Sequence, residues 1–163
     1  PGLRPTTDRV RETLFNWLQF EIHGARCLDL FAGSGVLGFE AASRGAGHVV
    51  LVEQAGRVFA MLEKNRLQLK LDDRVELVNS DALRWLAGNR DGFDIIFLDP
   101  PFGRQMLQPV IDALFASPAI KPGTRIYIEQ DSHEEPPALP DTWHMLREKV
   151  AGQVRYGLAG AQA

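Results

Sequence analysis

The sequence is poor in cysteine, in long apolar runs and in surplus positive charge. Its 163 residues include one cysteine, Cys27, so no disulfide can form within the chain, and a reducing cytoplasm is the expected location. No apolar run approaches the length of a membrane span, and the start shows no basic stretch followed by an apolar one, as a signal peptide would. Hydrophobic residues make up 45% and charged residues 24%, which predicts a single globular domain over 1–163 and no membrane partner.

The net charge of −3 argues mildly against a nucleic-acid binder, because such proteins gain affinity by neutralising phosphates. The charge is uneven, however, and arginine and lysine gather near the two ends, at Arg4, Arg9, Arg11, Arg147, Lys149 and Arg155. The chain begins at Pro1 rather than at Met, so we expect that a leading segment is missing. Such a segment would be able to carry more positive charge.

Buried strands alternate with helices along the chain, which predicts an α/β fold with a mostly parallel sheet and helices on both faces. The last two strands are joined by only Ala151 and Gly152, so they must run antiparallel, because a parallel pair needs a long crossover. The expected strands are Arg26–Leu30, His48–Glu53, Val75–Val78, Phe93–Leu98, Thr124–Glu129, Trp143–Val150 and Gln153–Leu158.

The expected helices follow from apolar residues at helical spacing. Val10, Leu14, Trp17 and Leu18 form one apolar face of an opening helix, with Thr7 or Asp8 as its N-cap. The other helices are predicted over Val36–Arg44, Gly56–Leu69, Ala82–Leu86 and Met106–Phe115.

A glycine-rich turn follows the first strand. Gly33, Gly35 and Gly38 fit the spacing G-x-G-x-x-G, which permits a tight turn and a close approach of a ligand to the backbone. Glu53 ends the second strand. Its spacing along the sequence from the glycines is about that at which an acidic residue binds ribose hydroxyls. These features allow both NAD and S-adenosylmethionine, because each presents a ribose.

Asp81 follows the third strand, and two interpretations are open for it. At a strand end it can accept a hydrogen bond from an adenine amino group. Equally, it can be the N-cap of the short helix that begins at Ala82.

The segment Asp99-Pro100-Pro101-Phe102 at the end of the fourth strand is the most informative. The two prolines remove two backbone donors, so the segment offers carbonyl oxygens, the Asp99 carboxylate and the flat ring of Phe102. An exocyclic amino group on a planar base carries N–H donors and fits such a corner. Acceptors there would also stabilise the positive charge that grows on the nitrogen during methyl transfer.

These motifs together resemble a known family. The Asp29–Gly35 segment with Asp99–Phe102 is similar to class I S-adenosylmethionine methyltransferases that act on amino nitrogens. The opening stretch 2–16 and the stretch 147–154 narrow the resemblance to the RsmD family of bacterial 16S rRNA guanine-N2 methyltransferases. The resemblance covers essentially the whole chain and implies a Rossmann-like, seven-stranded sheet with an antiparallel last strand.

The resemblance also implies roles for particular residues. Gly33 and Gly35 would line the methionine part of S-adenosylmethionine, Glu53 its ribose and Asp81 its adenine. Asp99, Pro100 and Phe102 would hold the target guanine. The remaining residues assigned in this way are Asp29, Phe31 and Ala82 for the cofactor and Thr7, Arg9 and Arg104 for the RNA. The expected partner is 16S rRNA within a small-subunit particle or assembly intermediate, and the expected state is a monomer.

Three alternatives remain. An NAD-dependent dehydrogenase explains the glycines but not Asp-Pro-Pro-Phe, and none of the four histidines (His23, His48, His133 and His144) sits at a well-placed strand end. A methyltransferase acting on DNA adenine or protein glutamine fits the same corner, since both present an amino or amide nitrogen. A non-enzymatic binding module on the same fold is the third. No metal site is expected, because Cys27 and the histidines are not spaced as ligands.

Overall fold

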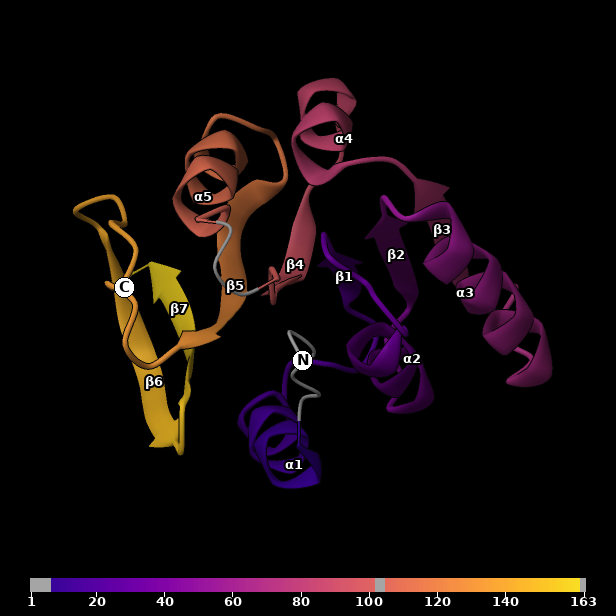
Figure 1. The fold of residues 1–163 in the computed structure, drawn as a ribbon, viewed down its shortest axis with the longest axis horizontal. Helices are drawn as coiled ribbons and strands as arrows, with labels where there is room; N and C mark the ends of the chain where they lie inside the picture. The colour runs from indigo at the N-terminus through magenta and orange to yellow at the C-terminus, as the bar shows by residue number, and fades with distance from the viewer. Residues whose placement is uncertain (1–6, 102–104, 162–163) are drawn as a thin grey trace.

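The structure is a computed structural model that describes residues 7–101 and 105–161. These residues form one twisted sheet with helices packed against it (Figure 1). The helices are α1 Asp8–Trp17, α2 Val36–Ser43, α3 Gly56–Gln68, α4 Ala82–Gly88 and α5 Leu107–Phe115. The strands are β1 Arg26–Asp29, β2 His48–Glu53, β3 Val75–Asn79, β4 Phe93–Leu98, β5 Ile120–Asp131, β6 Trp143–Ala151 and β7 Val154–Ala161.

The seven-stranded sheet has the order β3-β2-β1-β4-β5-β7-β6. The first five strands in this order pair in parallel, whereas β7 runs antiparallel to both β5 and β6. This confirms the predicted α/β class and the antiparallel last strand. Because β1 pairs with both β2 and β4, the strand order reverses there, and a crevice beyond the carboxyl ends of these strands is the expected ligand site.

The two faces of the sheet bury separate apolar clusters, because successive residues of a buried strand point to opposite faces. Phe97 of β4 joins Leu14 and Phe15 of α1 on one face, in a cluster that also includes residues of α2 and α3. Ile96 joins Ile111 of α5 and residues of α4 on the other. Figure 1 accordingly shows α1 and α2 on one side of the sheet and α4 and α5 on the other, as predicted.

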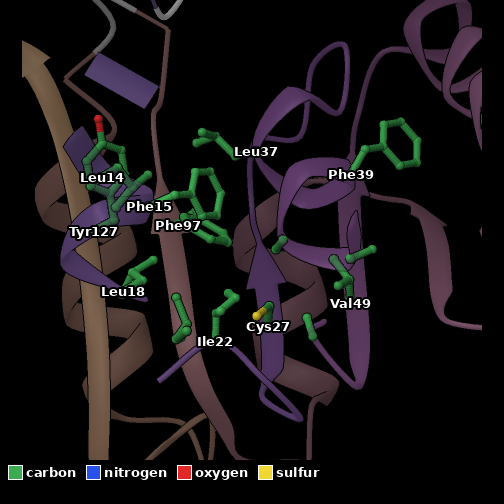
Figure 2. Packing of buried hydrophobic residues seen from close by; sticks show 14 of the residues in the cluster. Leu14, Phe15, Leu18, Ile22, Cys27, Leu37, Phe39, Val49, Phe97 and Tyr127 are labelled. Atoms are coloured by element: carbon green, nitrogen blue, oxygen red, sulfur yellow. The ribbon is translucent and has the colours of Figure 1, made fainter. Parts of the chain in front are cut away.

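Helix α1 forms where the apolar spacing predicted it. Thr7 is its N-cap, with its hydroxyl oxygen accepting a hydrogen bond from the Val10 N–H at 3.2 Å, so the first of the two predicted caps is the one used. The Phe15 ring packs against Phe97 at 6.2 Å between centroids, and Figure 2 shows the two rings side by side beneath Leu37. This packing holds α1 on one face of the sheet, against the carboxyl-terminal half of β4.

Most predicted boundaries are correct to within one or two residues, but β5 is much longer than predicted. It spans Ile120–Asp131 rather than Thr124–Glu129. Pro122 and Gly123, the latter with a φ of +89°, interrupt the apolar alternation and led the prediction to start too late. The strand nevertheless continues, because Phe93 of β4 pairs with Ile120, and after a register shift the pairing resumes with Ile95 opposite Arg125.

Candidate active site

Polar side chains end five neighbouring strands at one edge of the sheet. Glu53 ends β2, Asp29 ends β1, and Asp81 follows β3 after a short turn. Asp99 directly follows β4, and Glu129 lies near the end of β5. Since these five strands are parallel, their carboxyl ends meet at the same edge, so the predicted cofactor and base residues lie around a common centre.

The glycine turn between β1 and α2 has the backbone that its residues predict. Gly33 and Gly35 have φ values of +56° and +86°, a left-handed conformation that favours glycine, and Gly35 is the N-cap of α2. A side chain at Gly38 would collide with Leu51 of β2, so this glycine lets α2 lie close to the sheet. Around Gly33, by contrast, nothing lies within 4 Å of the position that a side chain would take. The turn therefore leaves a cradle of open space at Gly33.

Glu53 ends β2 and also fixes the glycine turn. Its Oε1 accepts a hydrogen bond from the Gly33 N–H at 2.8 Å, and its Oε2 accepts one from the Ala55 N–H at 2.9 Å. Each carboxylate oxygen can accept a further bond, so the ribose role predicted for Glu53 remains compatible with these contacts. The sequence pattern gave no indication that this carboxylate also holds the turn.

The two positive-φ glycines give a matched pair of substitutions. We expect Gly35→Ala to destabilise the fold more than Gly33→Ala, by about 1–3 kcal/mol, because its new methyl group would collide with Phe39 and Leu62. Both variants carry the left-handed strain, but only Gly33→Ala adds its methyl group to open space. Urea unfolding measures the first effect. Calorimetric titration with S-adenosylmethionine should show weaker binding by the well-folded Gly33→Ala, and equal stability losses in the pair would contradict this account.

Asp29 is a buried acid at the centre of this edge. It is 2% exposed, and its Oδ1 accepts a hydrogen bond from the Phe31 N–H at 3.1 Å. Burial raises the pKa of Asp29 to about 7; the Phe31 hydrogen bond opposes this shift, and the neighbouring charges of Asp99, Glu53 and Glu129 add to it. Asp29 therefore exchanges its proton near neutral pH, and a cation bound nearby would favour its ionised form.

This pKa makes the stability of the fold depend on Asp29 and on pH. Because the folded pKa is raised above the ordinary value of 3.8, the unfolded chain loses this proton first as the pH rises, so stability falls between about pH 4 and pH 7. We expect Asp29→Asn to be more stable than the parent at pH 8, by at most about 4 kcal/mol, and equally stable at pH 4. Thermal unfolding at both values checks this, with the exposed Asp72→Asn as the matched control. A difference that persists at pH 4 would contradict the assignment.

Asp81 is the N-cap of α4, which is one of the two roles predicted for it. Its Oδ1 accepts a hydrogen bond from the Arg84 N–H at 2.8 Å, and Ala82 behind it is buried. Its other oxygen is not used by the cap, so contact with adenine stays a prediction. Asn79, which the sequence did not single out, donates hydrogen bonds from Nδ2 to the carbonyls of Glu53 and Gln54 at 2.8 and 3.2 Å and ties β3 to β2 here.

The Asp-Pro-Pro corner follows β4 at the same edge. Asp99 is half-buried, Pro100 is buried and Pro101 is exposed, so the corner passes from the core to the surface over three residues. Phe102 and Arg104, predicted for the base and the RNA, lie outside the described residues. The Asp99 carboxylate lies close enough to the Asp29 carboxyl for its charge to help raise the pKa of Asp29.

The two residues predicted for RNA on the opening helix lie at its first turn. Thr7 caps α1 and is exposed, and Arg9 is exposed as well. The cap confirms the structural interpretation of Thr7. Contact of either residue with RNA or cofactor stays a prediction.

Sequence reasoning missed Glu129 and Tyr127. Glu129 is 0% exposed and accepts a hydrogen bond from the Tyr127 hydroxyl at 2.6 Å. It also lines a hollow together with Pro100, Pro101 and Met106. A carboxylate directly after the apolar run Ile126-Tyr127-Ile128 was the available indication, but its position near Asp99 depends on the pairing of β4 with β5.

Residues 7–101 and 105–161 show neither a metal site nor a membrane-spanning helix. No group of three or more histidine, cysteine, aspartate or glutamate side chains there is arranged to hold a metal ion. No helix within these ranges is long and apolar enough to cross a membrane.

Fold and site together define the class of protein. In an all-parallel dinucleotide-binding sheet the sixth strand extends the parallel order, whereas here the antiparallel β7 is inserted between β5 and β6. This is the sheet of a Rossmann-like methyltransferase, and a solved structure described as "Putative methyltransferase yhhF from Escherichia coli" has the same fold with a TM-score of 0.92. The two chains are 44% identical, and the match covers 98% of this chain and 89% of that one.

The particular family follows from the sequence matches. A family model described as "Conserved hypothetical protein 95" matches residues 1–159. Ribosomal RNA small subunit methyltransferase D of Escherichia coli strain K12 is 47% identical over 163 residues, covering 100% of this chain and 82% of that protein. The protein of the same name from Haemophilus influenzae is 44% identical over 160 residues, covering 96% and 82%. The chain belongs to the family of ribosomal RNA small subunit methyltransferase D, as the sequence resemblance predicted.

Proposed function

We propose that this chain transfers a methyl group from S-adenosylmethionine to the exocyclic N2 of a guanine in 16S ribosomal RNA. The names of its close relatives support methylation of small-subunit rRNA. The observation that carries the chemistry is the Asp99-Pro100 corner, an acceptor pair at the end of β4 and close to the Asp29 carboxyl that ends β1. Neither the relatives nor the fold favours an NAD-dependent oxidoreductase, or DNA adenine or protein glutamine as the target.

The residues at the edge of the sheet fit S-adenosylmethionine. When bound, it supplies a methyl group already activated as a sulfonium. The cradle at Gly33 has room for its methionine part, and the nearby carboxyl of Asp29 favours a cationic ligand. Glu53 accepts hydrogen bonds from the ribose hydroxyls, while the free oxygen of Asp81 accepts from the adenine amino group.

The chain's contribution to the reaction is to position the amino group and to stabilise its growing charge. The lone pair of an aromatic amine is delocalised into the ring, so the nitrogen is a weak nucleophile. Asp99 and the Pro100 carbonyl accept hydrogen bonds from its two N–H groups and turn the lone pair toward the methyl group. The same acceptors stabilise the positive charge that forms on nitrogen as the bond is made. Phe102 stacks on the base.

The substrate RNA is small-subunit rRNA, presented within an assembling or assembled subunit and bound by a monomer of this chain. The acceptors of Asp99 and Pro100 lie at the end of β4 and would hold a single base. The guanine must therefore leave any base stack to reach them. Thr7 and Arg9 at the exposed start of α1 contact the RNA near the site.

The test is transfer of labelled methyl from S-adenosylmethionine to 16S rRNA, comparing bare RNA, assembled small subunits and DNA. We expect label on a single guanine, and mass spectrometry of the digested RNA should show N2-methylguanosine. Label on adenine, on DNA or only on protein would overturn the proposal. The comparison of bare RNA with subunits identifies the assembly state that serves as substrate.

A further inference from the structure

A bulge in β6 turns two cationic side chains to the face of the sheet that carries α1. Met145 pairs with Ala159, which belongs to the apolar cluster on the α5 side. The register then shifts, so Arg147 pairs with Leu158, which belongs to the cluster on the α1 side. Side chains alternate along a strand, so Lys149 shares this face with Arg147. Without the bulge both cations would share the face of Met145, and bulges beside active sites often re-aim side chains in this way.

The strand register connects Lys149 with the methyl-transfer corner. Asp99 and Glu129 directly follow the last pair between β4 and β5. Glu129 pairs with Tyr156 of β7, which in turn pairs with Lys149 of β6. Lys149 therefore lies three strand spacings from Asp99, about 14 Å at the usual separation of strands. An extended RNA strand spans this distance with a few nucleotides.

Helix α1 lies next to this part of the sheet. Trp17 of α1 stacks on Tyr156 with 5.6 Å between the ring centroids, which holds the helix beside β7. Beyond β7, residues 146–153 of β6 and the hairpin turn are all exposed, so this part of β6 is open to solvent. Arg9, two turns before Trp17, is exposed as well. Figure 1 shows α1 and the end of the β6–β7 hairpin at the same end of the molecule.

The two cations of β6 lack a counter-charge on their face of the hairpin. Their partners on β7 are Leu158 and Tyr156, and Glu148 between them alternates to the opposite face. Within residues 7–101 and 105–161, neither Arg147 nor Lys149 forms an ion pair. Their Cα atoms lie about 7 Å apart along the strand. Their charges therefore repel each other, and a bound anion would relieve this repulsion.

Protection of the sheet edge does not account for this arrangement. Charged side chains on an edge strand such as β6 do prevent pairing with another sheet. Charges of either sign on either face serve that purpose, however, and here both charges on one face are positive. A chain with a net charge of −3 can bind RNA only where positive charge is concentrated. The α1 face of β6 provides such a place beside the site.

We propose that Arg147 and Lys149 bind phosphates of the RNA strand that leads to the target guanine, with Arg9 continuing the basic surface on α1. The inference rests on the proposed function and deepens it, because it names the surface that holds the substrate RNA beyond the target base. Phosphate contacts fix position and carry no sequence information. This surface therefore raises the affinity for RNA without changing which base is methylated.

The test removes both charges by combining Arg147→Gln with Lys149→Gln in one protein. Filter binding of labelled 16S rRNA, bare and in small subunits, is measured over a series of KCl concentrations. We expect the Kd for RNA to rise about threefold to thirtyfold, as the loss of two exposed ion pairs implies. The slope of log Kd against log salt concentration should fall by about 1 to 2. Methyl transfer should show a raised KM for RNA, with kcat and the Kd of S-adenosylmethionine unchanged.

Two further proteins serve as controls. Lys64→Gln with Lys70→Gln also removes two positive charges from exposed side chains, on α3 and just after it. Figure 1 shows α3 beside β3, at the opposite end of the sheet from β6, so this control should keep the RNA affinity within twofold. Arg147→Lys with Lys149→Arg retains both charges and should retain the affinity. Should the double glutamine variant fail to fold, each single substitution replaces it, with about half the change in slope.

Unchanged RNA affinity and salt dependence in the double glutamine variant would overturn the inference, and so would an equal loss in the lysine control. Weaker binding of small subunits alone, with bare rRNA bound as before, would also overturn it, because the surface would then contact a ribosomal protein. Failure of the proposed function looks different, because the unmodified protein would then transfer no methyl group to any guanine, whatever its affinity for RNA.

Discussion

Asp99→Ala is expected to lower kcat for methyl transfer by about a hundredfold to a thousandfold, the loss that follows when one preorganised group is removed from a developing charge. Asp99 follows β4 directly and stands beside Pro100, whose carbonyl remains in the variant. The variant therefore keeps one acceptor and loses the charged one. The affinity for S-adenosylmethionine should change less than threefold, because the glycine turn and Glu53 are untouched.

The measurement is single-turnover transfer of labelled methyl to small subunits, combined with calorimetric titration of the cofactor. Asp91→Ala is the matched control, since Asp91 lies just before the other end of the same strand and its side chain is 70% exposed. We expect the control to retain activity within twofold. Normal turnover by Asp99→Ala would remove Asp99 from the chemistry, and a parallel loss of cofactor affinity would assign it to cofactor binding instead.

The parts of the site that lie within one short segment could be predicted from the sequence. Gly33, Gly35 and Gly38 are spaced for a turn between a strand and a helix, and the positive φ of Gly33 and Gly35 and the close packing of Gly38 against Leu51 agree with this. The two prolines after Asp99 likewise define a donor-poor corner whatever surrounds them. Alternation of strands and helices was enough for the order of elements, and the two-residue link at Gly152 was enough for the antiparallel end.

Features that depend on contacts between distant segments could not be predicted in this way. The second role of Glu53 needs Gly33, which is 20 residues away, at 2.8 Å. The raised pKa of Asp29 needs its burial and three carboxylates from other strands. The position of Glu129 beside Asp99 follows from the register of β4 with β5, and β5 was itself predicted too short. Residue spacing carries no information about such register.

Glu53→Ala is expected to raise the Kd of S-adenosylmethionine by about tenfold to a hundredfold, because hydrogen bonds to a charged group contribute about 1.5–3 kcal/mol. Two different causes can produce this loss. The carboxylate is predicted to accept from the ribose hydroxyls, and it also holds the Gly33 and Ala55 N–H groups of the surrounding turns at 2.8 and 2.9 Å. Removal of the side chain thus affects both the ligand contact and the shape of the cradle.

A cycle of two proteins and two ligands separates these causes. Calorimetric titration of the parent and Glu53→Ala with S-adenosylhomocysteine and its 2′-deoxy derivative gives the coupling between the carboxylate and the ribose hydroxyl. We expect the substitution to weaken binding of the deoxy ligand at least fivefold less than binding of the complete one. Equal weakening of both ligands would mean that Glu53 acts only by holding the turn. In either case the turn contacts predict a lower unfolding temperature for the variant, since the Gly33 N–H loses its partner on β2.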